Sequence, residues 1–216
     1  MLRLHGYFRS SAAYRCRIAF NLKRVDYEFR AIHLRRNGGE QRMPGFRALN
    51  PQGLVPVLEV GGQVLTQSLA IIEWLDETHP EPPLLPEAPV DRAKVRAFAQ
   101  AIACDIHPLH NLRVLEYLRG DLGVEQAGLD KWCRKWIGEG LAACEAILAV
   151  QPREGRFCFG DFASLADVCL APQLHSAARF GVELDPWPRL RALKRTYSSV
   201  DAFVDAHPDN QPDSEA

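Results

Sequence analysis

Two neighbouring hydroxyl side chains, Ser10 and Ser11, stand where a short apolar segment gives way to a predicted helix, and the cationic Arg9 precedes them. The first turn of a helix has N–H groups without backbone partners and carries the positive end of the backbone dipole, so it favours an anion. These residue types in this order predict an anion-binding site at the start of the helix. The alternative is that both hydroxyls only cap the helix.

The elements around these serines predict a small α/β unit. Residues 2–7 alternate as a strand does, and the helix that follows is expected to run to about Lys23. A second alternating segment, residues 27–32, is connected to the first strand through that helix, which makes the two strands parallel. The predicted order is strand, helix, strand.

The next segment predicts a hairpin and a further helix. Pro56 heads an apolar strand, where a proline is tolerated at the start or the edge. Gly61-Gly62 is typical of a two-residue hairpin turn, so residues 63–65 should return as an antiparallel strand. Gln67 and Ser68 then open a helix. The sequence therefore predicts ββα after βαβ.

The composition is that of a globular protein without a strong charge bias. The chain has 216 residues, of which 47% are hydrophobic and 25% charged, and its net charge is −1. This balance argues against a general nucleic-acid or anionic-membrane surface, so neither is expected as a partner. Arg3 and His5 interrupt the first apolar run, and no run reaches the ~18 residues of a membrane span, so a cytoplasmic protein is expected.

The six cysteines are widely spaced and include neither a C-x-x-C pair nor a spacing with histidine that is typical of a metal site. Free and mostly buried thiols are therefore expected. Neither a metal centre nor a disulfide framework is expected.

A proline-rich segment predicts a domain boundary. Residues 79–89 contain five prolines and cannot continue the preceding helix. We therefore assign residues 1–80 to the α/β domain, residues 81–89 to a linker, and residues 90–216 to a domain of helices.

Within the helical domain, local signals predict where helices begin and end. Pro108 should kink or end a helix, and Ser164 with Asp167 imitates a reciprocal capping box. The polar, acidic tail, residues 207–216, is expected to fray.

Together these features resemble the zeta-class glutathione transferases. Val55-Pro56 before the third strand and Gln67-Ser68 at the third helix are similar to their thioredoxin-like glutathione-binding domain. Residues 10–19 resemble the class signature S-S-C-x-W-R-x-R-I-A, with Ala12 in place of the cysteine and Tyr14 in place of the tryptophan. The fold class implied is an α/β thioredoxin-like N-terminal domain (βαβ-ββα) followed by an all-α C-terminal domain. A mechanism that needs a protein thiol at the position of Ala12 is excluded.

The resemblance implies a homodimeric enzyme that uses glutathione as a cofactor to isomerise a maleyl keto acid from cis to trans. Maleylacetoacetate, from aromatic amino acid catabolism, is the expected substrate, and maleylpyruvate is the alternative because it presents the same maleyl end. General glutathione conjugation or dehalogenation is a second alternative. A non-catalytic binding protein of the same fold is a third.

The glutathione thiolate is then the anion expected at the helix start. Lowering a thiol pKa by ~2 units takes ~2.7 kcal/mol, which one hydroxyl donor and a helix N-terminus can supply. Ser10 is predicted as this donor, with Ser11 as the competitor. The Val55-Pro56 bond is expected to be cis, which would present the Val55 backbone to an extended peptide. The residues implied to bind the rest of the tripeptide are Gln52, Val55, Pro56, Gln67, Ser68 and His107.

Arginines are the partners expected for a dicarboxylate substrate, because their planar fork binds a carboxylate bidentately. The candidates are Arg9, Arg113 and Arg179. For Arg113 and Arg179 a solvated or C-terminal helix cation is the alternative, and His107 can instead be an ordinary histidine before a proline. Arg15 and Arg17 are assigned to the fold or to the dimer.

Overall fold

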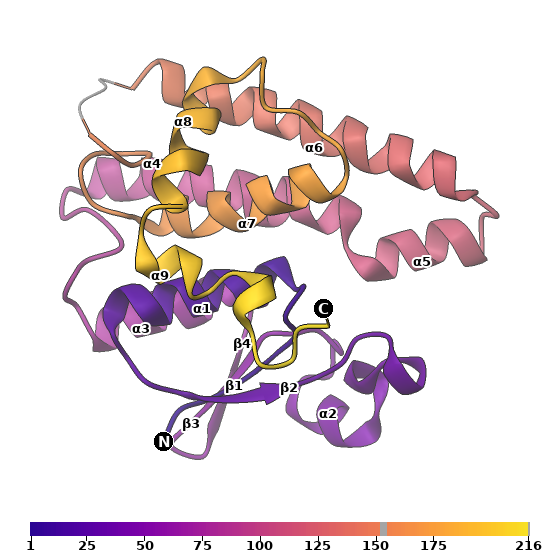
Figure 1. Ribbon diagram of the computed structural model, residues 1–216. Coiled ribbons are helices and arrows are strands. Elements are labelled where there is room, and N and C mark those ends of the chain that lie inside the picture. Colours follow the sequence, from indigo (N-terminus) through magenta and orange to yellow (C-terminus); the bar gives the residue numbers. More distant parts are fainter. Residues whose placement is uncertain (152–154, 216) are drawn as a thin grey trace. The chain divides into compact units, whose positions relative to one another are not determined.

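The computed structural model describes residues 1–151 and 155–215, and the chain divides into two compact units (Figure 1). The first unit comprises Met1–Pro83 and Ser199–Ala216, and the second comprises Leu84–Ser198. This division differs from the predicted domains because the end of the chain packs with the N-terminal residues. The boundary between the units falls after Pro83, inside the predicted linker of residues 81–89. Leu84 belongs to the second unit because it is buried and its carbonyl accepts a hydrogen bond from the N–H of Leu165 (2.9 Å).

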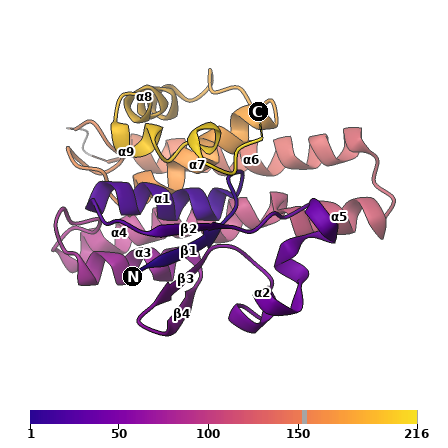
Figure 2. The ribbon, with the colours of Figure 1, turned by 60° about the horizontal axis from the view of Figure 1, so that its bottom comes forward.

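The first unit is built on a four-stranded sheet in the order β2-β1-β3-β4 (Figure 2). Strand β1 pairs in parallel with β2 and antiparallel with β3, which pairs antiparallel with β4. The elements are β1 (Arg3–Gly6), α1 (Ser11–Lys23), β2 (Glu28–Ala31), β3 (Val57–Val60), β4 (Gln63–Thr66) and α3 (Ser68–Thr78). The predicted βαβ-ββα order and the hairpin at Gly61-Gly62 are confirmed, and with them the thioredoxin-like domain.

Helices α1 and α3 pack against each other on one face of this sheet (Figure 1). Four side chains of their contact layer are fully buried, namely Ile18, Phe20, Ile71 and Leu75. Because the burial of apolar area is the main stabilising term, this layer fixes both helices relative to the sheet. The connection from β2 to β3 forms short helical turns, η1 (Arg36–Gly38), η2 (Glu40–Arg42) and α2 (Pro44–Leu49).

The C-terminal segment is part of the first unit, so the prediction that the tail frays is wrong for the residues described, which end at 215. Helix α9 (Asp201–Val204) packs against α1, and the turn η5 (Pro208–Asn210) follows it. Phe203 and Ala206 supply the apolar area, since they are 2% and 1% exposed. Both anchors lie just before the polar tail of residues 207–216, whose own composition does not indicate that it is held.

The second unit is built from helices. They are α4 (Pro89–Gln100), a π-helical stretch η3 (Ala101–Ile106), η4 (His107–His110), α5 (Leu112–Gly120), α6 (Gln126–Ala149), α7 (Leu165–Arg179) and α8 (Pro188–Tyr197). The predicted break at Pro108 is confirmed by the change from η3 to η4. A Cβ at Gly140 of α6 would lie 2.4 Å from the Ile106 side chain, so glycine permits the close approach of α6 to η3. Across residues 1–151 and 155–215, no helix is both long and apolar enough to cross a membrane.

The predicted capping box at the start of α7 is confirmed. One carboxylate oxygen of the fully buried Asp167 accepts hydrogen bonds from the backbone N–H (2.9 Å) and the hydroxyl (2.8 Å) of Ser164. Its other oxygen accepts from the Cys158 N–H and the Tyr197 hydroxyl, both at 2.8 Å. Asp167 therefore joins the start of α7 to the end of α8 and to the preceding loop.

Candidate active site

Three segments predicted to carry site residues leave the sheet of the first unit at the same end. His5 of β1 lies opposite Val57 of β3, which lies opposite Thr66 of β4. Strands β1 and β4 run toward this row, whereas β3 starts from it. The residues beyond the row are therefore neighbours, and they are residues 7–10, Val55-Pro56 and Gln67-Ser68. In α/β sheets, ligands commonly bind outside such strand ends.

Ser10 is the N-cap of α1. Its backbone is extended (φ −72°, ψ 115°), and its Oγ accepts a hydrogen bond from the Ala13 N–H (3.2 Å). A hydroxyl oxygen that accepts a bond can still donate its own proton to another acceptor. Capping and anion binding by Ser10 are therefore compatible. The first turn of α1 has no acidic residue, so no side chain of this turn repels an anion.

Arg9 and Ser11 flank this cap on either side. Ser11 is the first residue of α1 and is half-buried, as Ser10 is. Arg9 is exposed, and its guanidinium carbon lies 4.9 Å from the centroid of the Phe8 ring, a cation–π distance. The turn therefore presents one cation and two hydroxyls on consecutive residues.

The two predicted glutamines are joined directly. The Gln67 side-chain amide donates to Oε1 of Gln52 (2.9 Å), and the Gln52 N–H donates to Oδ1 of Asn50 (3.1 Å). Gln67 is the N-cap of α3 and has a positive φ of 70°, which costs a residue other than glycine about 1–3 kcal/mol. Such cost is typical of positions held for a function. The Val55-Pro56 bond is cis, as predicted.

Ser68 lies over a buried cation that the sequence reasoning missed. Ser68 begins α3 and is 7% exposed, and its Oγ accepts a hydrogen bond from Nη1 of Arg15 (3.3 Å). Arg15 is 2% exposed, and its Nε and Nη2 have no hydrogen-bond partner among the described residues. A buried guanidinium with unused donors beside a helix N-terminus attracts an anion. The available signal was an arginine on the inward face of α1, next to Cys16.

In the second unit, the predicted residues gather around η4. The rings of His107 and His110 lie 5.4 Å apart, and those of His110 and Phe180 lie 5.7 Å apart. The Arg179 guanidinium, at the end of α7, lies 4.7 Å from the Phe180 ring centroid. This chain of rings brings His107 and Arg179 into one neighbourhood. Arg113 is exposed in the first turn of α5, directly after η4, where its N–H donates to Oδ1 of the N-cap Asn111 (3.2 Å).

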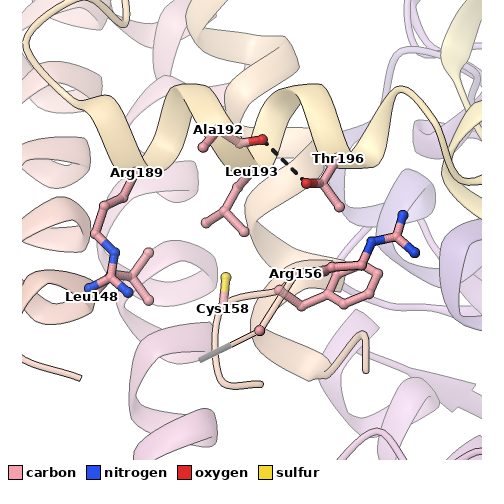
Figure 3. A pocket seen from close by; sticks show the side chains of 9 residues that line it. Leu148, Arg156, Cys158, Arg189, Ala192, Leu193 and Thr196 are labelled. Atoms are coloured by element: carbon pink, nitrogen blue, oxygen red, sulfur yellow. Dashed lines mark hydrogen bonds between the residues drawn. The ribbon is translucent and has the colours of Figure 1, made fainter. Parts of the chain in front are cut away.

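Three buried thiols, those of Cys133, Cys144 and Cys158, are poor nucleophiles. Burial raises the pKa of Cys133 to about 11 and that of Cys144 to about 12, so both stay protonated near neutral pH. Burial also raises the pKa of Cys158, whose sulfur points into a recess lined by Leu148, Arg156, Arg189 and Leu193 (Figure 3). No predicted site residue is among the described residues that line this recess.

Known proteins resemble this chain in sequence and in structure. A family model for the N-terminal domain of glutathione S-transferases matches residues 4–83. The maleylpyruvate isomerase of a Ralstonia species is 50% identical, over 99% of this chain and 100% of the relative. A solved holo structure described as a maleylpyruvate isomerase of the zeta class matches with a TM-score of 0.95 at 50% identity, over 99% of this chain and 100% of that chain. A maleylacetoacetate isomerase of Methylobacterium extorquens AM1, solved with malonate and glutathione bound, matches with a TM-score of 0.94 at 40% identity and the same coverage.

Proposed function

The chain belongs to the zeta-class glutathione transferases, and on this premise we propose that it is a glutathione-dependent isomerase that converts a maleyl keto acid to its fumaryl isomer. Maleylacetoacetate is the first candidate substrate. Maleylpyruvate is the second, because relatives named for each substrate match nearly the whole chain. The observation that carries the proposal is the row of strand ends that sets two helix N-termini, at Ser10 and Ser68, at one edge of the sheet.

The residues at this edge fit the tripeptide glutathione. The α3 N-terminus, the Ser68 hydroxyl and the unused donors of Arg15 suit the γ-glutamyl carboxylate. The linked side chains of Gln52 and Gln67 offer exposed amide groups beside it. The Val55 backbone and Pro56 are proposed to bind the cysteinyl part of the peptide. His107 is proposed to contact the part of glutathione that these residues leave unbound.

The chain's task in the proposed reaction is to hold one sulfur deprotonated and in place. When bound, glutathione supplies a thiolate nucleophile for reversible addition to the maleyl double bond. Ser10 donates a hydrogen bond to the sulfur, which contributes ~1.5–3 kcal/mol, and the dipole of α1 adds up to ~1 kcal/mol. Their sum matches the ~2.7 kcal/mol that a thiol pKa ~2 units lower requires. Ser11 is the competing donor. The overall change is a rotation about one carbon–carbon bond, without net gain or loss of atoms.

Three arginines are proposed to bind the carboxylates of the substrate. Arg9 adjoins Ser10 and is exposed, so it can reach a substrate close to the sulfur. Arg113 and Arg179 share the neighbourhood of η4 within the second unit. Their guanidinium groups also favour the negative charge that develops on the keto acid during addition.

Assay of the purified protein with maleylacetoacetate and maleylpyruvate, with and without glutathione, tests this function. We expect fumaryl product from at least one substrate only when glutathione is present. Conjugation of glutathione to a general electrophile without isomerisation would identify a general transferase. Glutathione binding without either reaction would identify a binding protein. The ratio of kcat/KM for maleylacetoacetate and maleylpyruvate decides which of the two is the preferred substrate.

We also propose a cytoplasmic homodimer. The six cysteines, all among the described residues, form no disulfide, and all but Cys104 are buried, which suits a reducing compartment. The dimer rests on membership in the family. Light scattering of the purified chain at micromolar concentration checks it, and a mass of one chain of 24.2 kDa would contradict it.

A further inference from the structure

The turn that carries Ser10 is held by a residue from the far end of the chain. The backbone N–H of Phe8 donates a hydrogen bond to Oδ2 of Asp213 at 3.0 Å, across 205 positions of sequence. Phe8 lies two residues before Ser10, between β1 and α1. Asp213 therefore contacts the turn between β1 and α1, residues 7–10, which we call the catalytic turn because it carries Ser10.

A second charged group holds the same turn from its other side. Nη2 of Arg17 donates to the Phe8 carbonyl (3.0 Å) and Nη1 to the Tyr7 carbonyl (3.5 Å), which also accepts from the Ser10 N–H (2.9 Å). The N–H of Phe8 is therefore bonded to Asp213 and its carbonyl to Arg17, and both of these side chains are ionisable. Hydrogen bonds to charged groups are stronger than neutral ones, so these bonds help to fix the path of the chain into Ser10.

The C-terminal segment is itself anchored on each side of this contact. Nε of Arg17 donates to the Ala206 carbonyl (3.0 Å), so Arg17 joins the catalytic turn to the segment. Beyond Asp213, the Glu215 carboxylate pairs with His33 and Arg36 of the first unit. These anchors need no carboxylate at 213, so the Phe8 bond is a separate function of the segment.

The environment of Asp213 indicates that its carboxylate is committed to the turn. Its Oδ1 is buried and has no hydrogen-bond partner among the described residues. An aspartate that served only solubility would be exposed to water, as Asp209 of the same segment is.

We propose that Asp213 is a positioning residue that fixes the Ser10 hydroxyl through the Phe8 amide, so that the C-terminal segment helps to set the site that stabilises the thiolate. This inference rests on the proposed role of Ser10. It predicts that loss of Asp213 affects turnover more than glutathione binding, because the groups proposed to bind the tripeptide are on other segments.

Asp213→Ala and Asp213→Asn test the proposal, with Asp209→Ala as the matched control that removes the same charge from an exposed position of the same segment. For Asp213→Ala we expect a fall in kcat of about tenfold or more, as small misplacements of catalytic groups produce. The KM for glutathione should change little, and the pKa of the bound thiol should rise. Hydrogen exchange of the Phe8 amide should accelerate. Asp209→Ala should match the native chain in every measurement.

Asp213→Asn keeps an oxygen acceptor without the charge, so its kcat should lie between those of the native chain and Asp213→Ala. If Asp213→Ala does not fold, this intermediate kcat and a faster exchange of the Phe8 amide remain the test. A native kcat in either variant, with the Phe8 amide exchanging freely, would overturn the inference. A native chain without isomerase activity would instead remove the proposed function.

Discussion

Replacement of Arg15 by Met should weaken glutathione binding without loss of stability. Arg15 is 2% exposed, yet Nε and Nη2 of its guanidinium have no hydrogen-bond partner among the described residues. Replacing such an incompletely paired buried ion by an apolar side chain of similar length is often neutral or stabilising, by about 1–4 kcal/mol. The free energy of unfolding should therefore stay the same or increase.

The expected loss of affinity follows from the unused donors of Arg15, which we propose to bind the γ-glutamyl carboxylate. A hydrogen bond to a charged group contributes ~1.5–3 kcal/mol. Loss of ~1.5 kcal/mol corresponds to about tenfold weaker binding. Cysteinylglycine lacks the γ-glutamyl carboxylate, so its affinity should not change.

Arg17→Met is the matched control, two residues further along α1. Arg17 is fully buried as well, but its donors bond to the carbonyls of Ala206, Tyr7 and Phe8. Because its loss leaves buried acceptors unsatisfied, the free energy of unfolding should fall by roughly 2–4 kcal/mol.

Urea unfolding gives the stability of each variant, and isothermal titration calorimetry gives its affinity for glutathione. A less stable Arg15→Met variant with native affinity would refute the reasoning, because Arg15 would then be a structural residue as Arg17 is.

Four further substitutions test other parts of the account. Asp167→Ala should lower the free energy of unfolding by about 3–5 kcal/mol in urea, because the donors that surround this buried carboxylate lose their acceptor; a loss below ~1 kcal/mol would contradict this. A hydrogen bond from His5 lowers the pKa of Glu59 below its ordinary 4.5, so this contribution to stability is present above pH 4.5 and is lost as the pH falls through the lower, folded value. Glu59→Gln should flatten the acid limb of the stability curve in thermal melts. Arg113→Met and Arg179→Met should raise KM for the maleyl substrate by about tenfold with native glutathione affinity, and an unchanged KM would make both arginines ordinary surface cations.

Local patterns were sufficient to predict most elements. The period-two segments, the Gly61-Gly62 turn and the break at Pro108 each act within a few residues of themselves, and the structure confirms all of them. The Ser164–Asp167 capping box is equally local, since the two residues are one helical turn apart.

Contacts between distant residues were not predictable in this way. Asp213 belongs to a polar tail, and nothing near it in sequence indicates that it accepts a bond from Phe8. The two apolar anchors just before this tail, Phe203 and Ala206, become evident only once α1 is present to cover them. Arg15 has the same character, because its missing partners are visible only after α1 and α3 pack together.

The most direct test of the central claim is the pKa of glutathione's thiol when it is bound to the native chain, to Ser10→Ala and to Ser11→Ala, measured from the ultraviolet absorbance of the thiolate. We expect a value ~2 units below the ordinary 8.5 on the native chain and a rise of ~1–2 units on Ser10→Ala, with kcat lower by about tenfold or more. Ser11→Ala should remain close to native. An unshifted thiol on the native chain, or a rise with Ser11→Ala instead of Ser10→Ala, would contradict the account.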